Sequence, residues 1–320
     1  MTGGAGFIGS HLVHRLVGLG HRVRVVDNLS TGHVSNLAQV ASQIDFVEGD
    51  LRAQGVCDDV TSEIDYVFHV AAQPSVARSM AAPLASHENN VNATLFILEA
   101  ARKNGAKRVI YSSSSSTYGD EPDLPKRETS EPKPKSPYAA AKLAGEQYAL
   151  AYARCGLIEA VALRYFNVFG PRQDPNGPYA AVVPAIFRAA VTAMPMIIYG
   201  DGRQTRDFTY VDNVVNANVL AATLPGDRVS GHVVNVGGGQ RTSLLEVVEA
   251  VRHLTSANIP ILFHPARPGD VRDSLASLDR ARTVLGYEPK VSLEQGLLNL
   301  WHWLREQSSV GARRPATSTG

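Results

Sequence analysis

The sequence predicts an α/β protein in which a doubly wound parallel sheet is joined to a smaller α/β lobe. Up to about residue 165, apolar β-branched runs alternate with amphipathic helical segments, which is typical of parallel strands connected by crossover helices. A glycine-rich turn at the start of the chain leads directly into one of these helices. Beyond Phe166, loops rich in Gly, Pro, Asp and Arg interrupt shorter helices, which indicates a second lobe over the carboxyl ends of the strands.

The glycine-rich turn occupies residues 2–10. Gly4, Gly6 and Gly9 fit the spacing G-x-G-x-x-G, and Gly3, Gly6 and Gly9 also fit G-x-x-G-x-x-G. Such a turn lets the backbone approach a pyrophosphate, and the N-terminus of the next helix presents free N–H groups to the anion. The pattern alone is also typical of ordinary turns, so its context decides.

That context is a helix over 11–19, with Gly20 as its C-cap, followed by a strand that ends at Asp27. An acidic side chain at this place accepts both adenosine-ribose hydroxyls and repels a 2′-phosphate. The sequence therefore predicts a Rossmann-type sheet that binds NAD rather than NADP.

Only Met1 and Thr2 precede the glycine turn, so the first strand of the predicted sheet is missing from this chain. Strands usually have about 5–6 residues. Burying about four apolar side chains in one contributes roughly 6–12 kcal/mol, against about 5–15 kcal/mol for the whole stability of a domain. We expect that the numbered chain starts late, the alternative being that this version is compromised.

The remaining elements follow in order. Strands are predicted at Ile44–Glu48, Tyr66–Val70, Arg108–Tyr111 and Ala160–Arg164, and helices at Asn89–Asn104 and Pro137–Arg154. We expect residues 1–165 to form the nucleotide-binding domain, with 211–236 returning to it. Residues 166–210 and 237–306 are expected to form the substrate-binding lobe, and 307–320 a disordered tail.

Composition excludes several classes of protein. A net charge of +1 with scattered basic residues argues against a nucleic-acid-binding surface. No apolar run approaches the ~18 residues of a membrane span. Two cysteines in different predicted elements indicate reduced thiols rather than a disulfide framework, and we expect a cytoplasmic protein without metal ligands.

A candidate acid/base pair lies in the segment Ser136–Lys142. Tyr138 and Lys142 are four residues apart, so they share a helical face, and Pro137 suits the first position of that helix. A tyrosine of pKa about 10 is only about 0.1% phenolate at pH 7. A nearby ammonium and a cationic cofactor ring favour the phenolate, and a shift of about 3 units requires roughly 4 kcal/mol. The alternative is a surface Tyr–Lys pair, which is common.

A run of hydroxyl side chains lies after the strand that begins at Arg108. Ser114 is the candidate to hydrogen-bond the same substrate oxygen as Tyr138, with Ser113 and Ser115 as its neighbours. Five consecutive serines are equally typical of a low-complexity loop, and not all of them can be catalytic.

Together these motifs resemble the extended short-chain dehydrogenase/reductases, and among them the UDP-hexose 4-epimerases. The resemblance is carried by TGGAGFIGSH, DNLSTG at 27–32, GDL at 49–51, HVAAQ at 69–73, SSSSSTYG and YAAAK. It continues through RYFNVFGPRQDPNG (164–177), YGDGRQTRDFTYVDN (199–213) and RPGDVRDSLASL (267–278), and so covers almost the whole chain.

The resemblance implies roles for individual residues. Ser114, Tyr138 and Lys142 would be catalytic, with Lys142 also holding the nicotinamide ribose. The cofactor would be bound by Gly3, Gly6, Phe7, Ile8, Gly9, Asp27, Asn28, Asp50, Leu51 and Ala71. The nucleotide sugar would be bound by Ser113, Ser115, Asn167, Tyr199, Arg206, Arg267, Asp270 and Ser274.

The type of reaction is predicted from the residues that come after Ser114. In the resembled dehydratases and decarboxylases an acidic residue comes directly after the catalytic Ser/Thr, whereas here no acid occurs before Asp120. This favours epimerisation through a 4-keto sugar. Ser274 replaces the bulky tyrosine of epimerases restricted to non-acetylated hexoses, which favours UDP-GlcNAc and UDP-GalNAc. UDP-glucose or UDP-glucuronate epimerisation, or a non-catalytic NAD-binding regulator, are the alternatives. We also expect a homodimer through helices 89–104 and 137–154.

Overall fold

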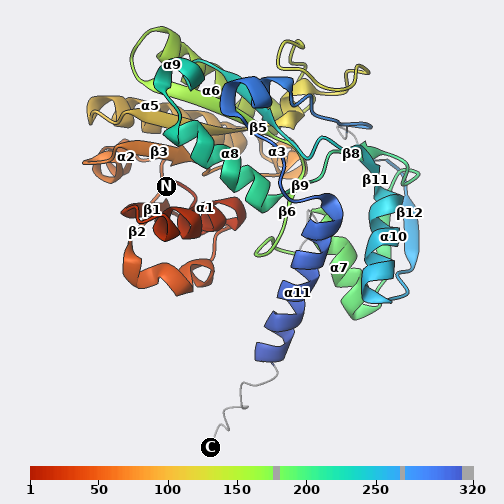
Figure 1. The fold of residues 1–320 in the computed structure, drawn as a ribbon. Helices are drawn as coiled ribbons and strands as arrows, with labels where there is room; N and C mark the ends of the chain where they lie inside the picture. The colour runs from red at the N-terminus through yellow and green to blue at the C-terminus, as the bar shows by residue number, and fades with distance from the viewer. Residues whose placement is uncertain (176–180, 267–270, 312–320) are drawn as a thin grey trace, which may run out of the picture.

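The computed structural model describes residues 1–175, 181–266 and 271–311 (Figure 1). The first half of the described chain contains α1 (Phe7–Gly18), β1 (Val23–Asp27), η1 (Val34–Gln43), β2 (Ile44–Glu48), α2 (Gln54–Thr61), β3 (Tyr66–His69), α3 (Val76–Ala81), α4 (Pro83–His87), η2 (Glu88–Asn92), α5 (Ala93–Lys103), β4 (Arg108–Ser114), η3 (Ser115–Tyr118), α6 (Pro137–Arg154) and β5 (Glu159–Tyr165).

The second half continues through shorter elements. These are β6 (Val168–Phe169), α7 (Val182–Thr192), β7 (Met196–Tyr199), β8 (Thr205–Arg206), β9 (Thr209–Tyr210), α8 (Val211–Thr223), α9 (Gly226–Val229), β10 (Val233–Val236), β11 (Thr242–Ser243), α10 (Leu244–Thr255), β12 (Ile261–His264), η4 (Ala281–Leu285) and α11 (Leu293–Gly311).

The main sheet is parallel and has the order β2–β1, then β3–β4–β5–β10. Thr2 joins the two parts, because it forms parallel bridges with Val26 of β1 and with His69 of β3. Figure 1 accordingly shows the N-terminus between β1 and β3. The place of the strand predicted to be missing is thus taken by Met1 and Thr2, with the Thr2 amide donating to the Phe68 carbonyl at 3.0 Å.

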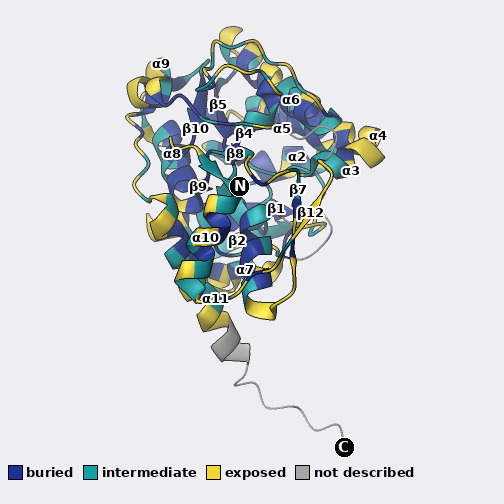
Figure 2. Ribbon diagram, turned by 90° about the vertical axis from the view of Figure 1, so that its right-hand side faces the viewer, coloured by how far each residue is buried: buried dark blue, intermediate teal, exposed yellow. Residues whose placement is uncertain are grey.

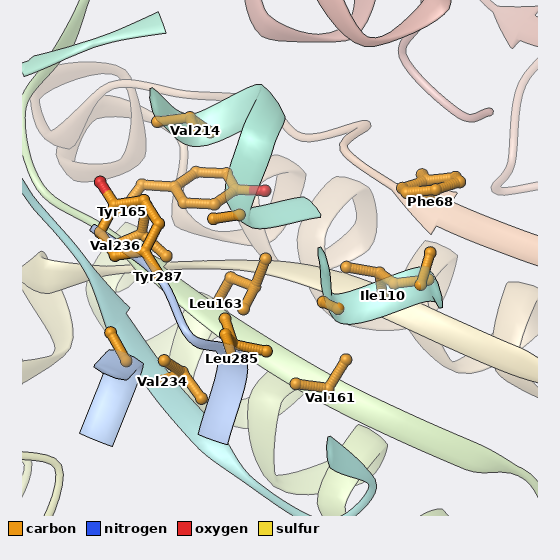
Figure 3. Packing of buried hydrophobic residues seen from close by; sticks show 14 of the residues in the cluster. Phe68, Ile110, Val161, Leu163, Tyr165, Val214, Val234, Val236, Leu285 and Tyr287 are labelled. Carbon is orange, nitrogen blue, oxygen red and sulfur yellow. The ribbon is translucent and has the colours of Figure 1, made fainter. Parts of the chain in front are cut away.

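Helices cover both faces of this sheet, which confirms the predicted doubly wound class. Side chains alternate across β4, so that Ile110 packs in a cluster with α1 and α8, while Val109 and Tyr111 pack with α2, α5 and α6. Figure 3 shows the first of these clusters, in which Phe68, Ile110 and Leu163 of the strands lie near Val214 of α8 and Leu285 of η4. Figure 2 shows the buried residues at the centre and the exposed residues at the surface.

The second lobe contains more strand than expected from its loops. β7 pairs with β12 in parallel, β8 pairs with β11 in antiparallel register, and β6 pairs with β9. Its own core gathers apolar side chains from α7, α10 and α11, including Phe187, Val247 and Leu297. Residues 211–236 form α8, α9 and β10, and β10 lies beside β5 in the main sheet.

The predicted tail starts too early. Residues 307–311 belong to α11, which begins at Leu293 and ends at Gly311, so the helix continues through a polar stretch expected to be irregular. Residues 312–320 lie outside the described part of the chain. No helix within the described ranges is long and apolar enough to cross a membrane.

Candidate active site

A cavity of about 1040 Å³ opens at the carboxyl ends of β1, β3, β4 and β5. Ligands of open parallel α/β sheets bind at this edge, where the loops after the strands meet. The second lobe contributes Arg206 and Ser274 to the same cavity. The site is therefore built by both lobes.

The glycine turn forms one wall of the cavity, and its backbone leaves no room for side chains. Gly3 has a φ of +65°, and a Cβ there would lie 2.7 Å from the Ala71 backbone. A Cβ on Gly9 would lie 2.0 Å from the Gly3 carbonyl oxygen. Gly6 is the N-cap of α1 and provides no side-chain cap, so the helix presents its first N–H groups without a side-chain acceptor. This geometry fits an anion such as a pyrophosphate.

Asp27 lies at the end of β1 and supports that turn. Its Oδ2 accepts the Ala5 amide at 2.9 Å and its Oδ1 accepts the Leu29 amide at 2.9 Å. Each carboxylate oxygen keeps a second lone pair that remains available to a ligand hydroxyl. Asp27 and Phe7, Ile8, Leu51 and Ala71 all line the cavity.

Asn28 and Asp50 meet on the same side of the cavity. The Asn28 amide donates to Asp50 Oδ2 at 3.1 Å, and Arg52 Nη2 donates to the same oxygen at 2.7 Å. These contacts, chiefly those from Arg52, lower the pKa of Asp50 to about 2. The carboxylate is therefore ionised throughout the physiological range.

Tyr138 and Lys142 lie in the opening turns of α6, as predicted. Ser136 is the N-cap, and its side chain accepts the Ala139 amide at 3.2 Å, while Pro137 occupies the first turn. Lys142 is 4% exposed, and its Nζ donates to the Ser112 carbonyl at 2.7 Å. Burial lowers the pKa of Lys142 to about 7. Burial raises the pKa of Tyr138, and a hydrogen bond with the Ser114 side chain opposes that effect.

The serine run divides its hydroxyls between two faces of β4, since successive side chains of a strand point to opposite sides. Ser114 forms the hydrogen bond with Tyr138 and accepts the Ser116 hydroxyl at 2.8 Å. Ser113 also lines the cavity, but its hydroxyl donates to Glu146 of α6 at 2.7 Å. The hydroxyl proton of Ser113 is therefore already used in a hydrogen bond within the protein. Ser115 lines the cavity from η3.

Three of the predicted substrate residues meet at the second lobe. Asn167 has a φ of +25°, and its amide lies 3.5 Å from the Ser274 hydroxyl. Ser274 is 7% exposed, and its backbone amide donates to the Thr205 carbonyl at 3.1 Å. Arg206 donates to the Arg272 carbonyl at 2.7 Å. A hydrogen-bonding amide, a small hydroxyl and a guanidinium thus share one end of the cavity.

The structure does not bring every predicted residue to this place. Tyr199 is half-buried on β7 with its ring centroid 5.8 Å from that of His264, and it is not among the residues lining the cavity. Arg267 and Asp270 lie outside the described residues.

Two carboxylates that organise the site were missed by the sequence analysis. Asp207 is buried and accepts the backbone amides of Gly238, Gly239 and Ala276, which holds the Ser274 segment beside the cavity. Burial raises the pKa of Asp207 to about 6. Glu146 is buried under the serine run. Asp207 lies in a polar segment and Glu146 lies in a helix, and acidic residues in such segments are ordinarily at the surface. Only burial in the folded structure distinguishes these two from surface residues.

Comparison with known proteins places these features in a family. Residues 1–237 match the model of the "NAD dependent epimerase/dehydratase family". A UDP-glucose 4-epimerase from Mycolicibacterium smegmatis is 40% identical over 314 residues, which are 96% of this chain and 98% of that protein.

Solved structures with the same fold include two epimerases. The UDP-glucose 4-epimerase of Thermotoga maritima with UDP-glucose superposes with a TM-score of 0.91 at 38% identity, covering 96% of this chain and 98% of that one. The UDP-N-acetylglucosamine 4-epimerase of Methanobrevibacter ruminantium, in complex with UDP-N-acetylmuramic acid, gives 0.89 at 37% identity, covering 96% and 97%.

Proposed function

This chain belongs to the NAD-dependent epimerase/dehydratase family, and we propose that it is a UDP-sugar 4-epimerase that interconverts UDP-GlcNAc and UDP-GalNAc. NAD is the cofactor, and the glycine turn fits it, because the absence of a Cβ at Gly3 and Gly9 lets the turn close tightly beside the helix N-terminus. Gly3, Gly6, Phe7, Ile8 and Gly9 hold its pyrophosphate, Asp27 its adenosine ribose, and Asn28, Asp50, Leu51 and Ala71 complete that wall. When bound, NAD supplies a group that accepts a hydride and gives it back.

The chemistry of the protein is proton transfer and orientation at one sugar hydroxyl. Tyr138 takes the proton of the 4-hydroxyl and later returns it, and Ser114 hydrogen-bonds the same oxygen. The Lys142 ammonium holds the nicotinamide ribose and stabilises the Tyr138 phenolate electrostatically. The observation that carries this proposal is the convergence of these three side chains at the end of β4.

Epimerisation is favoured over elimination by the carboxylates around the cavity. Among the described residues that line it, the acids are Asp27, Asp50 and Asp174, and none of them comes directly after Ser114 on η3. Asp120, the first acid after the serine run, accepts the Arg272 amide and the Lys135 ammonium, both at 3.1 Å. A base for removing a sugar C–H proton is therefore not provided beside Ser114.

The acetylated sugar is favoured by the size of Ser274. Asn167 and Arg206 bind the diphosphate, together with Arg267 beyond the described residues, and Ser115 faces the sugar. Since Ser274 lines the cavity with only a hydroxymethyl group, it leaves space for a 2-acetamido substituent. A tyrosine at this position would occupy that space.

A panel of sugars tests the proposal. Wild-type protein is assayed with UDP-GlcNAc, UDP-glucose and UDP-glucuronate, beside Ser274→Tyr and the space-conserving control Ser274→Ala. We expect Ser274→Tyr to lower kcat/KM for UDP-GlcNAc at least about 10-fold relative to UDP-glucose, equivalent to roughly 1.4 kcal/mol. The control should keep the wild-type preference. Wild-type preference for UDP-glucose or UDP-glucuronate, or full N-acetyl activity of Ser274→Tyr, would contradict the assignment.

The same proposal includes a homodimer. Leu84 of α4 is 79% exposed and Met80 of α3 is 56% exposed, beside a groove lined by Pro83, Pro137, Ala140, Ala141 and Ala144. Figure 2 shows α4 as an exposed edge of the molecule. Small residues on α6 allow a helix of a second copy to approach closely, and sedimentation velocity measures whether the protein is a dimer.

The free cysteines Cys57 and Cys155 suit a reducing compartment, and we place the reaction in the cytoplasm.

A further inference from the structure

Glu146 lies two helical turns after Tyr138, on the same face of α6. Tyr138, Lys142 and Glu146 are spaced four residues apart, so they form a row along the helix. Glu146 is 0% exposed, although a glutamate in a helix is ordinarily at the surface. A buried carboxylate in the same row as the candidate acid/base pair requires a physical reason.

The partners of Glu146 come from two neighbouring strands. Its Oε2 accepts the Ser113 hydroxyl at 2.7 Å and Arg164 Nε at 2.9 Å, and its Oε1 accepts Arg164 Nη2 at 2.6 Å. Ser113 of β4 and Arg164 of β5 are register partners. One carboxylate therefore ties α6 to the carboxyl ends of both strands.

The contacts of Glu146 with Ser113 and Arg164 lie next to the groups that face the substrate. Ser114, the next residue after Ser113, hydrogen-bonds Tyr138, and the Ser112 carbonyl on the other side accepts Lys142 Nζ. Arg164 also stacks on the ring of Tyr118, with its guanidinium carbon 4.5 Å from the ring centroid. A displacement of α6 along β4 would thus disturb both contacts of the acid/base pair at once.

A buried ion pair is a weak source of stability, because desolvation of the two charges offsets much of their attraction. Its geometric demands are strict, since a bidentate guanidinium–carboxylate contact fixes both distance and orientation. The pair is therefore better suited to fixing the helix than to strengthening the fold.

We propose that Glu146 is a positioning residue, which fixes α6 against β4 and β5. Tyr138 thereby keeps its hydrogen bond with Ser114, and Lys142 keeps its hydrogen bond with the Ser112 carbonyl. This inference rests on the proposed function for its kinetic consequences. Its geometric consequence, the environment of the Tyr138 phenol, is independent of any substrate.

The test compares Glu146→Gln with Glu159→Gln. Glu159 pairs with Arg108 at 2.6 Å at the opposite ends of β4 and β5, so the control removes the carboxylate of the other arginine–carboxylate pair at these strands. We expect Glu146→Gln to lower kcat about 10-fold with KM for the UDP-sugar and the dissociation constant for NADH within about 2-fold of wild type. The control should keep kcat.

The second readout is the titration of Tyr138 by NMR of ¹³Cζ-tyrosine-labelled protein, with its resonance assigned from Tyr138→Phe. Loosening of the hydrogen bond from Ser114 should raise the pKa of Tyr138 in Glu146→Gln and shift the pH profile of kcat upward. A loss of stability without displacement of α6 would not move this titration. Ser113→Ala removes one contact of the carboxylate without leaving a charge unpaired, and should give a smaller change in the same direction.

The double variant Glu146→Gln/Arg164→Met covers the case in which the lone Arg164 charge prevents folding, and it should still show the kinetic loss. If every folded variant keeps the wild-type kcat and Tyr138 titration, the inference is overturned. If the wild type epimerises no UDP-sugar, the proposed function fails, and the titration still decides the role of Glu146.

Discussion

An arginine–carboxylate pair lies at each end of β4 and β5, and the two pairs are built differently. At the amino ends, Arg108 binds Glu159, and its Nη1 also donates to the carbonyls of Ala221, Ala222 and Leu224 at the end of α8. Glu159 is 34% exposed. At the carboxyl ends, Arg164 and Glu146 are both buried, and Glu146 also accepts the Ser113 hydroxyl of β4.

The difference between the two pairs indicates that one stabilises the fold and the other fixes the geometry of the active site. The amino-end pair caps a helix and keeps one partner in water, which limits its desolvation penalty. The carboxyl-end pair accepts the full penalty of burial next to Tyr138 and Lys142. The same interaction therefore serves stability at one end of a strand pair and preorganisation at the other.

The largest effect is expected from removing a phenol hydroxyl at the active-site end of α6, compared with removing one at its other end. Tyr138→Phe should lower kcat about 10³-fold, within the range for losing a general acid/base. Tyr152 lies in the last turns of the same helix and donates to Glu99 at 3.0 Å, so Tyr152→Phe should stay within about 2-fold of wild type. A coupled assay of UDP-sugar epimerisation measures both. Unchanged turnover by Tyr138→Phe would contradict the acid/base role assigned to Tyr138.

Lys142 provides a pH-dependent contrast with Arg108, because both cations are buried but only lysine can lose its proton in this range. The unfolded chain keeps the Lys142 proton up to a pKa of about 10.4, whereas burial lowers the folded value to about 7. Between these values the unfolded state binds more protons, so the free energy of unfolding rises with pH.

Lys142→Met should remove this dependence. Relative to that variant, the wild type without ligands should gain stability from pH 7 to pH 10, on the order of 4 kcal/mol in total. Urea unfolding across this range measures the difference. Parallel curves for the two proteins would contradict the lowered pKa.

Glu159→Gln, which alters the pair at the amino ends of the strands, should have the smallest effect. It leaves the Arg108 guanidinium with its three carbonyl acceptors, so we expect a loss of about 1–2 kcal/mol of unfolding free energy. Since the pair lies at the amino ends of the strands, kcat should not change. Calorimetry and the epimerase assay together check this, and a kcat loss without a stability loss would reverse the roles assigned to the two ends.

The candidate catalytic residues at the carboxyl end of β4 were predictable, because they are recognised from their spacing over a short stretch of sequence. The i, i+4 relation of Tyr138 and Lys142 and the hydroxyl run after the strand predict that these side chains meet at this end of the sheet. The glycine turn and Asp27 predicted the nucleotide-binding fold for the same reason. The role of Glu146 was not predictable, because it depends on contacts across three elements. Likewise β7 and β12 are short apolar runs between Gly- and Pro-rich loops, and only their pairing makes them strands.

The proposed 4-epimerase activity is tested directly by the conversion of UDP-GlcNAc in D₂O by the wild-type protein with NAD. We predict an equilibrium mixture with UDP-GalNAc in which C4 keeps its original hydrogen, because Tyr138 exchanges only the hydroxyl proton. NMR of the product reads both the configuration and the isotope at C4. No epimer of UDP-GlcNAc, or deuterium at C4 of the product, would contradict the account.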